Sequence, residues 1–370
     1  MSSSLKLSLI AGFAMFSMFF GSGNLVFPIL IGAEAQSSYV YAILGFVITA
    51  VCVPFLGLLG IMQAQGDRRI YFSTLGKAPA FILTLLMLML IGPFGVIPRC
   101  VSVAFGGFEV IFPTLPLWVF SLVFCLLTTI LIWRRNKIVD IIGVFITPVK
   151  LGSFILLIII GLIVSEQHLS AGIAPFLSFK EGIHQGYQTM DLVASFFFGS
   201  AIYEYLKGHL SADTSEKKLL KLGVMASLVG GLLLALCYIG FVILGARYGH
   251  ILANAPKEAL LTIVAQQTLG SYAVPFIAFT LAVSCLATAT ILATLFADFL
   301  QHDIARDKIS RPYAIAITIA TSYAMSLLGF QGICVLLGTI LEWVYPLLII
   351  YAIFQIGKHM YASSKTVTHT

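Results

Sequence analysis

Charged residues are scarce in this sequence. Asp, Glu, Lys and Arg together make up 10% of the 370 residues, whereas 59% of the residues are hydrophobic. Soluble domains carry about 25% charged residues, so this composition excludes an ordinary soluble globular protein. No polar stretch between the apolar segments is long enough to fold as a separate soluble domain. The composition therefore predicts a protein that crosses a membrane several times.

Cysteine and histidine are also few, and neither residue type forms a cluster. The six cysteines lie singly in apolar segments, and no two of them have the spacing of a metal or redox motif. The seven histidines lie in connections or near the ends of apolar segments. No segment brings together a nucleophile, a base and a metal-binding group. These absences argue against an enzyme, a metal site and a cofactor.

Apolar segments of membrane-spanning length recur along the chain. About 20 apolar residues cross a bilayer, and ten segments qualify: 7–31, 38–63, 78–106, 115–133, 138–165, 187–205, 219–246, 271–298, 311–330 and 332–356. The first is too long for a signal peptide, so we expect it in the mature protein. We divide the chain into a five-helix unit (1–165), an external connection (166–186), a second five-helix unit (187–356) and a cytoplasmic tail (357–370).

The distribution of lysine and arginine predicts the orientation in the membrane. Sixteen of them fall on the side of the N-terminus and three on the opposite side, and basic loops stay in the cytoplasm. Both termini are therefore expected to be cytoplasmic. The formal net charge of +6 is explained by this topology, so no nucleic-acid partner is expected, whereas the lipid bilayer is. The sequence specifies no oligomeric state.

A short string occurs twice inside apolar segments, as SMFFGS at 17–22 and as SFFFGS at 195–200. Glycine costs about 1 kcal/mol relative to alanine inside a helix. A helix break within a bilayer needs a polar or protein-lined cavity beside it. The strings predict interruptions in helices 1 and 6, and five helices per half give the halves opposite orientations, as in inverted-repeat transporters. The alternative is that these small residues allow close helix packing.

The interrupted helices predict a substrate site. Free N–H groups after the first break favour a carboxylate, and free carbonyls at Phe19 and Phe20 favour sodium or an ammonium group. An amino acid with an apolar side chain carries both charges, and the phenylalanines would line its side chain, although each could instead serve packing. The predicted substrate-binding residues are Phe20, Gly21, Ser22, Gly23, Asn24, Phe196, Phe197, Phe198, Gly199 and Ser200.

Several segments resemble the bacterial branched-chain amino acid:cation symporters. The resemblance is carried by FGSGNLVFP (20–28), IGP (91–93), IPR (97–99), FITP (145–148), GYQTMD (186–191) and SCLATA (284–289). It implies an all-α membrane protein with a LeuT-like 5+5 inverted repeat in the bacterial inner membrane. It further implies import of leucine, isoleucine and valine by alternating access, driven by sodium or protons. Family members commonly have twelve spans, and ten are predicted here. The alternatives are a carrier for other neutral amino acids and a membrane channel.

The resemblance also implies an ion site between the first-helix carbonyls and hydroxyls of the eighth helix. Its predicted residues are Ser17, Phe20, Ser284, Thr288 and Lys150. Ala287 stands where the family tends to have a second threonine, which removes one sodium ligand. Lysine in a bilayer must pair, line a cavity or deprotonate, so Lys150 could replace sodium and couple transport to protons. The alternative is a snorkelling or structurally paired lysine.

Three further ionisable residues lie within apolar segments and are candidates for the pathway or its gates. Arg99 either lines the pathway or pairs with an acidic group such as Glu109. Asp191 is most simply a helix N-cap, and Glu342 either faces a cavity or pairs across the bundle. Asp140, Glu204 and Asp298 lie near cytoplasmic helix ends. These last three are either gate ion pairs or solvated interfacial charges.

Overall fold

The computed structural model describes residues 3–133, 147–165, 169–210 and 214–367. Within these ranges the chain is helical and contains no strand. The α-helices are α1 (Ser3–Phe19), α2 (Ser22–Ala35), α3 (Tyr39–Val47), α4 (Val53–Gln63), α5 (Arg68–Phe72), α6 (Lys77–Ile91), α7 (Val96–Glu109), α8 (Leu117–Trp133), α10 (Thr147–Val164), α11 (Pro175–Gln188), α12 (Asp191–Gly208), α13 (Glu216–Leu252), α14 (Leu260–Leu269), α15 (Val274–Phe299), α16 (Arg311–Ser326) and α17 (Gly329–Val367). The predicted all-α polytopic fold class is confirmed.

Many of these helices have the length and composition of membrane spans. Among the described residues, five helical segments are long and apolar enough to cross a membrane: Ser22–Gln63, Lys77–Glu109, Glu216–Leu252, Ser271–Ile304 and Gly329–Lys358. Shorter apolar helices cover Ser4–Phe19, Leu117–Trp133 and Pro148–Val164. Their outer faces carry exposed leucine, isoleucine and phenylalanine side chains, which is the surface that a bilayer requires.

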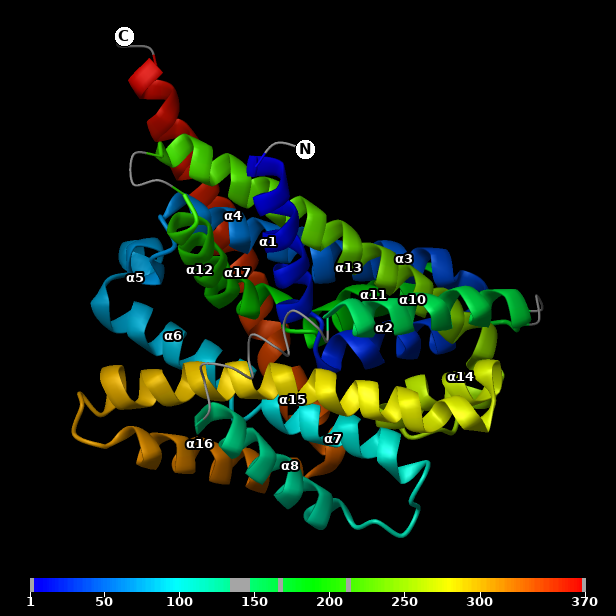
Figure 1. Ribbon diagram of the computed structural model, residues 1–370. Coiled ribbons are helices and arrows are strands. Elements are labelled where there is room, and N and C mark those ends of the chain that lie inside the picture. Colours follow the sequence, from blue (N-terminus) through cyan, green and yellow to red (C-terminus); the bar gives the residue numbers. More distant parts are fainter. Residues whose placement is uncertain (1–2, 134–146, 166–168, 211–213, 368–370) are drawn as a thin grey trace.

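The helices gather into two groups (Figure 1). α15 lies along α7, α8 and α16, whereas α13 lies along α1 and α2, α11 along α3, and α12 along α4. α17 contacts both groups, since it packs against α4 and α11 as well as against α7 and α16. α2, which follows the predicted first break, also contacts α7 of the other group.

The first predicted break is present. α1 ends at Phe19 and α2 begins at Ser22, with Gly21 between them in an extended conformation (φ −106°, ψ −158°). The backbone N–H of Gly21 donates to the side-chain oxygen of Asn24 at 3.1 Å, which fixes the start of α2. Small residues that weaken the helix and a polar residue that caps its continuation therefore act together here.

The second break is real, but the predicted position was wrong. α12 runs without interruption from Asp191 to Gly208, through the whole of the 195–200 string. The Ser195 hydroxyl donates to the Leu192 carbonyl at 2.6 Å, and Gly199 packs against Ile61 of α4. The string thus serves helix packing, which was the alternative interpretation. The chain instead breaks at 189–190, where Met190 adopts a left-handed conformation with φ 61°.

The predicted external connection at 166–186 is partly helical. Its second part forms α11, which extends from Pro175 to Gln188 and packs against α3 and α2. Gly182 and Gly186 allow this close contact, since an added Cβ would lie 2.5 Å from the Ala42 carbonyl and 1.9 Å from the Thr49 hydroxyl, respectively. α11 is therefore the first half of the interrupted helix, and α12 is the second.

Glycines bring α2 and α13 into backbone contact. A Cβ on Gly32 would lie 2.0 Å from the carbonyl oxygen of Val242, and a Cβ on Gly245 would lie 2.1 Å from that of Ile29. No side chain fits between the two helices at these points. Small residues of this kind permit close helix association within a bilayer, where the hydrophobic effect does not drive helices together.

We expect Gly32→Ala to destabilise the protein, because the added methyl group would overlap the α13 backbone. Overpacking of this kind costs about 1–3 kcal/mol. Gly152→Ala is the matched control. Gly152 is also helical, and no atom among the described residues lies within 4 Å of the position that an added Cβ would take. Thermal unfolding of the purified variants should show a lower midpoint for Gly32→Ala only. Equal midpoints for both variants would contradict the close α2–α13 contact.

Candidate functional site

The two breaks lie directly against each other. A Cβ on Gly23 of α2 would lie 3.1 Å from the Cα of Thr189 in the second break. The side-chain amide of Asn24 donates to both carboxylate oxygens of Asp191, at 3.1 and 2.8 Å. The Oδ1 atom of Asn24 also accepts the N–H of Gly21 in the first break. One asparagine therefore connects the two interruptions.

Asp191 is buried at this junction. Tyr238 of α13 donates its hydroxyl to the second carboxylate oxygen at 2.9 Å, and the Asn24 amide also contacts that hydroxyl. Among the described residues, no nitrogen of Lys, Arg or His lies within 4.0 Å of the carboxylate. The N-cap prediction is wrong, because Met190 occupies the N-cap position of α12 and the Asp191 carboxylate bonds to other helices.

The carbonyl of Phe20, freed by the first break, is occupied by a lysine. Lys150 of α10, only 3% exposed, donates its ammonium to this oxygen at 2.7 Å and lies 5.3 Å from the centre of the Phe20 ring. The hydroxyl of Ser284 on α15 donates to the same oxygen at 3.4 Å. The predicted ion-coupling residues Lys150, Phe20 and Ser284 thus lie together.

The other two predicted ion-coupling residues lie beside this group. Thr288 donates its hydroxyl to the Ser284 carbonyl at 3.2 Å, one turn away on α15, and its side chain faces Gly21. Ser17 lies on α1, one turn before the first break. Their roles in ion coupling remain predictions.

The second break has a corresponding buried cation. Arg99 of α7, 1% exposed, donates to the backbone carbonyl of Gln188 at 2.7 Å and to its side-chain oxygen at 2.6 Å. The guanidinium also lies 5.2 Å from the centre of the Phe27 ring. The suggested pairing with Glu109 is wrong, because Arg99 forms no ion pair within the described residues. At both breaks, a buried cation therefore binds a carbonyl at the end of the first half-helix.

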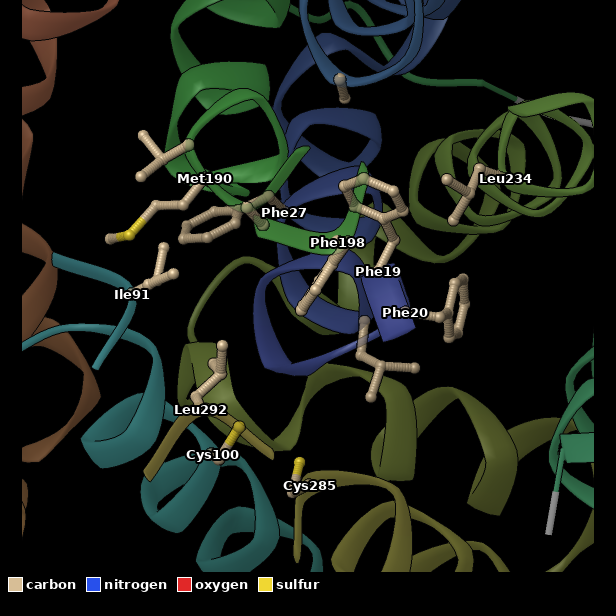
Figure 2. Close-up of a cluster of buried hydrophobic side chains, with 14 of the residues drawn as sticks. Phe19, Phe20, Phe27, Ile91, Cys100, Met190, Phe198, Leu234, Cys285 and Leu292 are labelled. Carbon is tan, nitrogen blue, oxygen red and sulfur yellow. The ribbon is translucent and has the colours of Figure 1, made fainter. Parts of the chain in front are cut away.

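The predicted phenylalanine wall is only partly assembled. Phe198 meets Phe19 edge to face, with ring centres 5.2 Å apart, beside the first break (Figure 2). Phe196 instead packs on Tyr71 and Phe72, near α5, with ring centres 5.5 and 5.4 Å away.

Two other predicted site residues on α12, Phe197 and Ser200, also lie near α5 and the residues before it. The ring of Phe197 lies 4.4 Å from the Arg68 guanidinium carbon, and Ser200 lines a small polar cavity with residues of the 65–69 segment. α12 carries these residues away from the junction because the helix continues where a break was predicted.

Phe20 belongs to a separate aromatic cluster. Its ring contacts Phe16, Phe154, Phe241 and Tyr238, with centres 4.9 to 6.3 Å apart. In Figure 2 the Phe20 side chain is directed away from the Phe19–Phe198 pair. The cluster holds the end of α1 against α10 and α13, so it positions the carbonyl that Lys150 binds.

Ion pairs join separate elements away from the junction. Glu342 of α17 pairs with His184 of α11 at 3.1 Å, which is the cross-bundle alternative. Arg69 pairs with Asp303 at 2.9 Å, and Asp298 approaches Arg311 at 3.6 Å. Glu204 has no basic nitrogen within 4.0 Å among the described residues, and Asp140 lies outside them.

Sequence reasoning missed Tyr238 and Gln188. Gln188 belongs to a polar run, Gln185 to Asp191, at the edge of an apolar segment, and this run was the available signal for the second break. Tyr238 is a single tyrosine inside an apolar helix, and nothing in its neighbourhood marks it. Only the packing of α13 against α2 brings it to Asp191.

Comparisons with known proteins agree on one family and one fold. Residues 4–370 match the family described as branched-chain amino acid transport protein. A putative branched-chain amino acid carrier protein of Staphylococcus epidermidis is 29% identical, over 92% of this chain and 79% of its own length. The branched-chain amino acid permease BrnQ of Bacillus subtilis is 28% identical, over 97% of this chain and 82% of its own length.

Solved structures with a similar fold include the transporter Mhp1. Its inward-facing conformation superimposes with a TM-score of 0.61 at 13% identity, covering 92% of this chain and 75% of Mhp1. The closed form, a nucleobase-cation-symport-1 family transporter with bromovinylhydantoin bound, gives a TM-score of 0.60 at 13% identity, covering 93% of this chain and 77% of its own. This likeness establishes a LeuT-like helical fold.

We expect Arg99→Met to destabilise the protein, because it leaves the Gln188 carbonyl without its buried donor. Leaving a buried neutral acceptor without its donor costs about 1–3 kcal/mol. Arg99→Lys keeps the charge but cannot donate to both oxygens from one planar group, so its loss should be intermediate. The midpoints of thermal unfolding of the purified proteins should be highest for the unsubstituted chain, intermediate for Arg99→Lys and lowest for Arg99→Met. A midpoint for Arg99→Met equal to that of the unsubstituted chain would contradict the assigned role of Arg99.

Proposed function

This chain belongs to the family of branched-chain amino acid transport proteins, and we propose that it imports leucine, isoleucine and valine by secondary active transport. It works in the bacterial cytoplasmic membrane with both termini inside, and its two helix groups move against each other in alternating access. The observation that carries the coupling proposal is the hydrogen bond from Lys150 to the Phe20 carbonyl.

The junction of the breaks suits an amino acid with an apolar side chain. α2 begins there, so its first N–H groups and the positive end of its dipole favour the substrate carboxylate. The buried Ser22 hydroxyl at this helix start has no oxygen or nitrogen partner and lies beside the Cys100 thiol. It is an available donor for the same carboxylate. Phe19 and Phe198 offer an apolar surface nearby.

The proposed coupling ion is the proton, carried by Lys150. A buried lysine changes its protonation state more readily than an exposed one, because burial disfavours the charged form. When protonated, Lys150 binds α10 to the end of α1, and loss of the proton would weaken that bond. The protonation state of Lys150 would then control how firmly the end of α1 is attached to α10.

Sodium is the less favoured ion at this position. Sodium needs several oxygen ligands, and here the Phe20 carbonyl already accepts from Lys150 and Ser284. Ala287 supplies no side-chain oxygen. A tethered ammonium thus lies where a sodium ion would have to be bound.

Two ion pairs are candidates for gates of the proposed alternating access. His184–Glu342 joins the first half of the second interrupted helix to α17. Arg69–Asp303 joins the segment after α4 to the segment after α15, and these belong to the two different helix groups. Exposed pairs of this kind contribute about 0–1 kcal/mol each, so they can open and close without a large barrier.

Lys150→Met should abolish proton-driven leucine uptake, because methionine keeps an unbranched side chain of similar length but cannot carry a proton. The measurement is uptake of radiolabelled leucine into liposomes that contain the purified protein, with proton and sodium gradients imposed separately. Lys217→Met, at an exposed position of α13, is the control and should transport normally.

Other outcomes of the same assay separate the parts of the proposal. Proton-driven uptake by Lys150→Met at the normal level would remove Lys150 from the mechanism. Accumulation by the unsubstituted chain under a sodium gradient alone would contradict proton coupling. No accumulation under either gradient would contradict the proposed transport itself.

A further inference from the structure

Three backbone oxygens at the two breaks, those of Phe19, Phe20 and Gln188, already accept hydrogen bonds. The Phe20 carbonyl accepts from Lys150 and Ser284, and the Phe19 carbonyl accepts the N–H of Gly21 at 2.7 Å. At the other break, Arg99 donates to the Gln188 carbonyl at 2.7 Å. The groups that would ordinarily attract a positive charge at a helix end are thus occupied by side chains of the protein. An amino acid that enters the junction must place its ammonium group elsewhere.

One acidic group at the junction, Asp191, has hydrogen-bond donors but no cationic partner within 4.0 Å among the described residues. Three charged side chains are buried among the described residues, namely Arg99, Lys150 and Asp191, and only Asp191 is acidic. Its side-chain partners, Asn24, Tyr238 and Thr189, are all neutral. An ionised carboxylate in a dry interior is stable only when a positive charge or several hydrogen bonds compensate it. Neutral donors alone leave its negative charge available to a cationic ligand.

The position of Asp191 matches the geometry of an amino acid. Its carboxylate is bonded to the Nδ2 atom of Asn24, and the Oδ1 atom of Asn24 is bonded to the Gly21 N–H at the start of α2. The carboxylate of Asp191 and the positive end of α2 are therefore separated by a single side-chain amide. A substrate with an ammonium and a carboxylate on one carbon needs receptor groups of opposite charge at this separation.

We propose that the Asp191 carboxylate binds the α-ammonium group of the transported amino acid. This inference rests on the proposed function and adds to it the group that recognises the amino end of the substrate. Asn24 and Tyr238 are positioning residues, because they hold the carboxylate between the two breaks. The hydrogen bonds to this carboxylate come from neutral groups only, so among the described residues no cation competes with the substrate ammonium for its negative charge.

The test compares two ligands that differ only in the ammonium group. Equilibrium binding of radiolabelled leucine to the purified full chain is measured, and 4-methylpentanoate, which is leucine without its amino group, is used as the competitor. Asp191→Asn should weaken leucine binding at least about 30-fold, since it removes one charge of a buried pair. Binding of 4-methylpentanoate should change little, so the preference for leucine over this analogue should largely disappear.

Two further variants control the test. Asp307→Asn also removes a carboxylate, but from an exposed position where a left-handed backbone tolerates asparagine, and it should leave both affinities unchanged. Tyr238→Phe keeps the ring contacts with Phe20 and Phe46 while removing one donor to Asp191. It should reduce the preference for leucine in the same direction but by less. This variant keeps the inference testable even if Asp191→Asn does not fold.

The outcomes distinguish this inference from the proposed function. Equal losses for both ligands in Asp191→Asn would show a structural role and overturn the inference, and so would an unchanged preference for leucine. An unsubstituted chain that binds no branched-chain amino acid would instead overturn the proposed function.

Discussion

A membrane protein cannot leave backbone carbonyl groups unpaired in its interior, and this constraint determines the arrangement at the centre of the molecule. Each helix interruption frees carbonyls that water would otherwise hydrate. The protein meets the requirement with cationic side chains from neighbouring helices, Lys150 at Phe20 and Arg99 at Gln188. The placement of α7 and α10 against the broken helices follows, because each must bring one long side chain to a particular oxygen.

The two cations are chemically different, and the difference gives the two breaks different properties. Arginine stays protonated in proteins and donates from a planar group, so the Arg99–Gln188 attachment is permanent. Lysine can lose its proton when buried, so the attachment of Lys150 to Phe20 is conditional. If Lys150 carries the coupling proton as proposed, the second break stays fixed while the attachment of the first break changes with protonation.

The sequence predicted the helical fold and the first break but misplaced the second. At 21–24, two glycines, a serine and an asparagine lie together inside an apolar run, and the helix breaks there. At 189–190 no glycine is present, and a methionine adopts the left-handed conformation. The glycines nearby, Gly186 and Gly199, serve helix contacts instead. Lys150 was predicted to lie at an ion site with Phe20, and it donates to the Phe20 carbonyl, 130 residues earlier in the chain. The sequence did not show that this carbonyl would be its direct acceptor.

The order of synthesis distinguishes the two buried cations. The carbonyl acceptor of Lys150 belongs to Phe20, 130 residues earlier in the chain, so it is already in the membrane when α10 arrives. The acceptor of Arg99 belongs to Gln188, which is synthesised 89 residues after Arg99. Because chains are made from the N-terminus, the first five helices are inserted while this guanidinium still lacks its final acceptor. The arrival of α11 provides that acceptor, so the first half of the molecule reaches its final structure only after the second half has begun to insert.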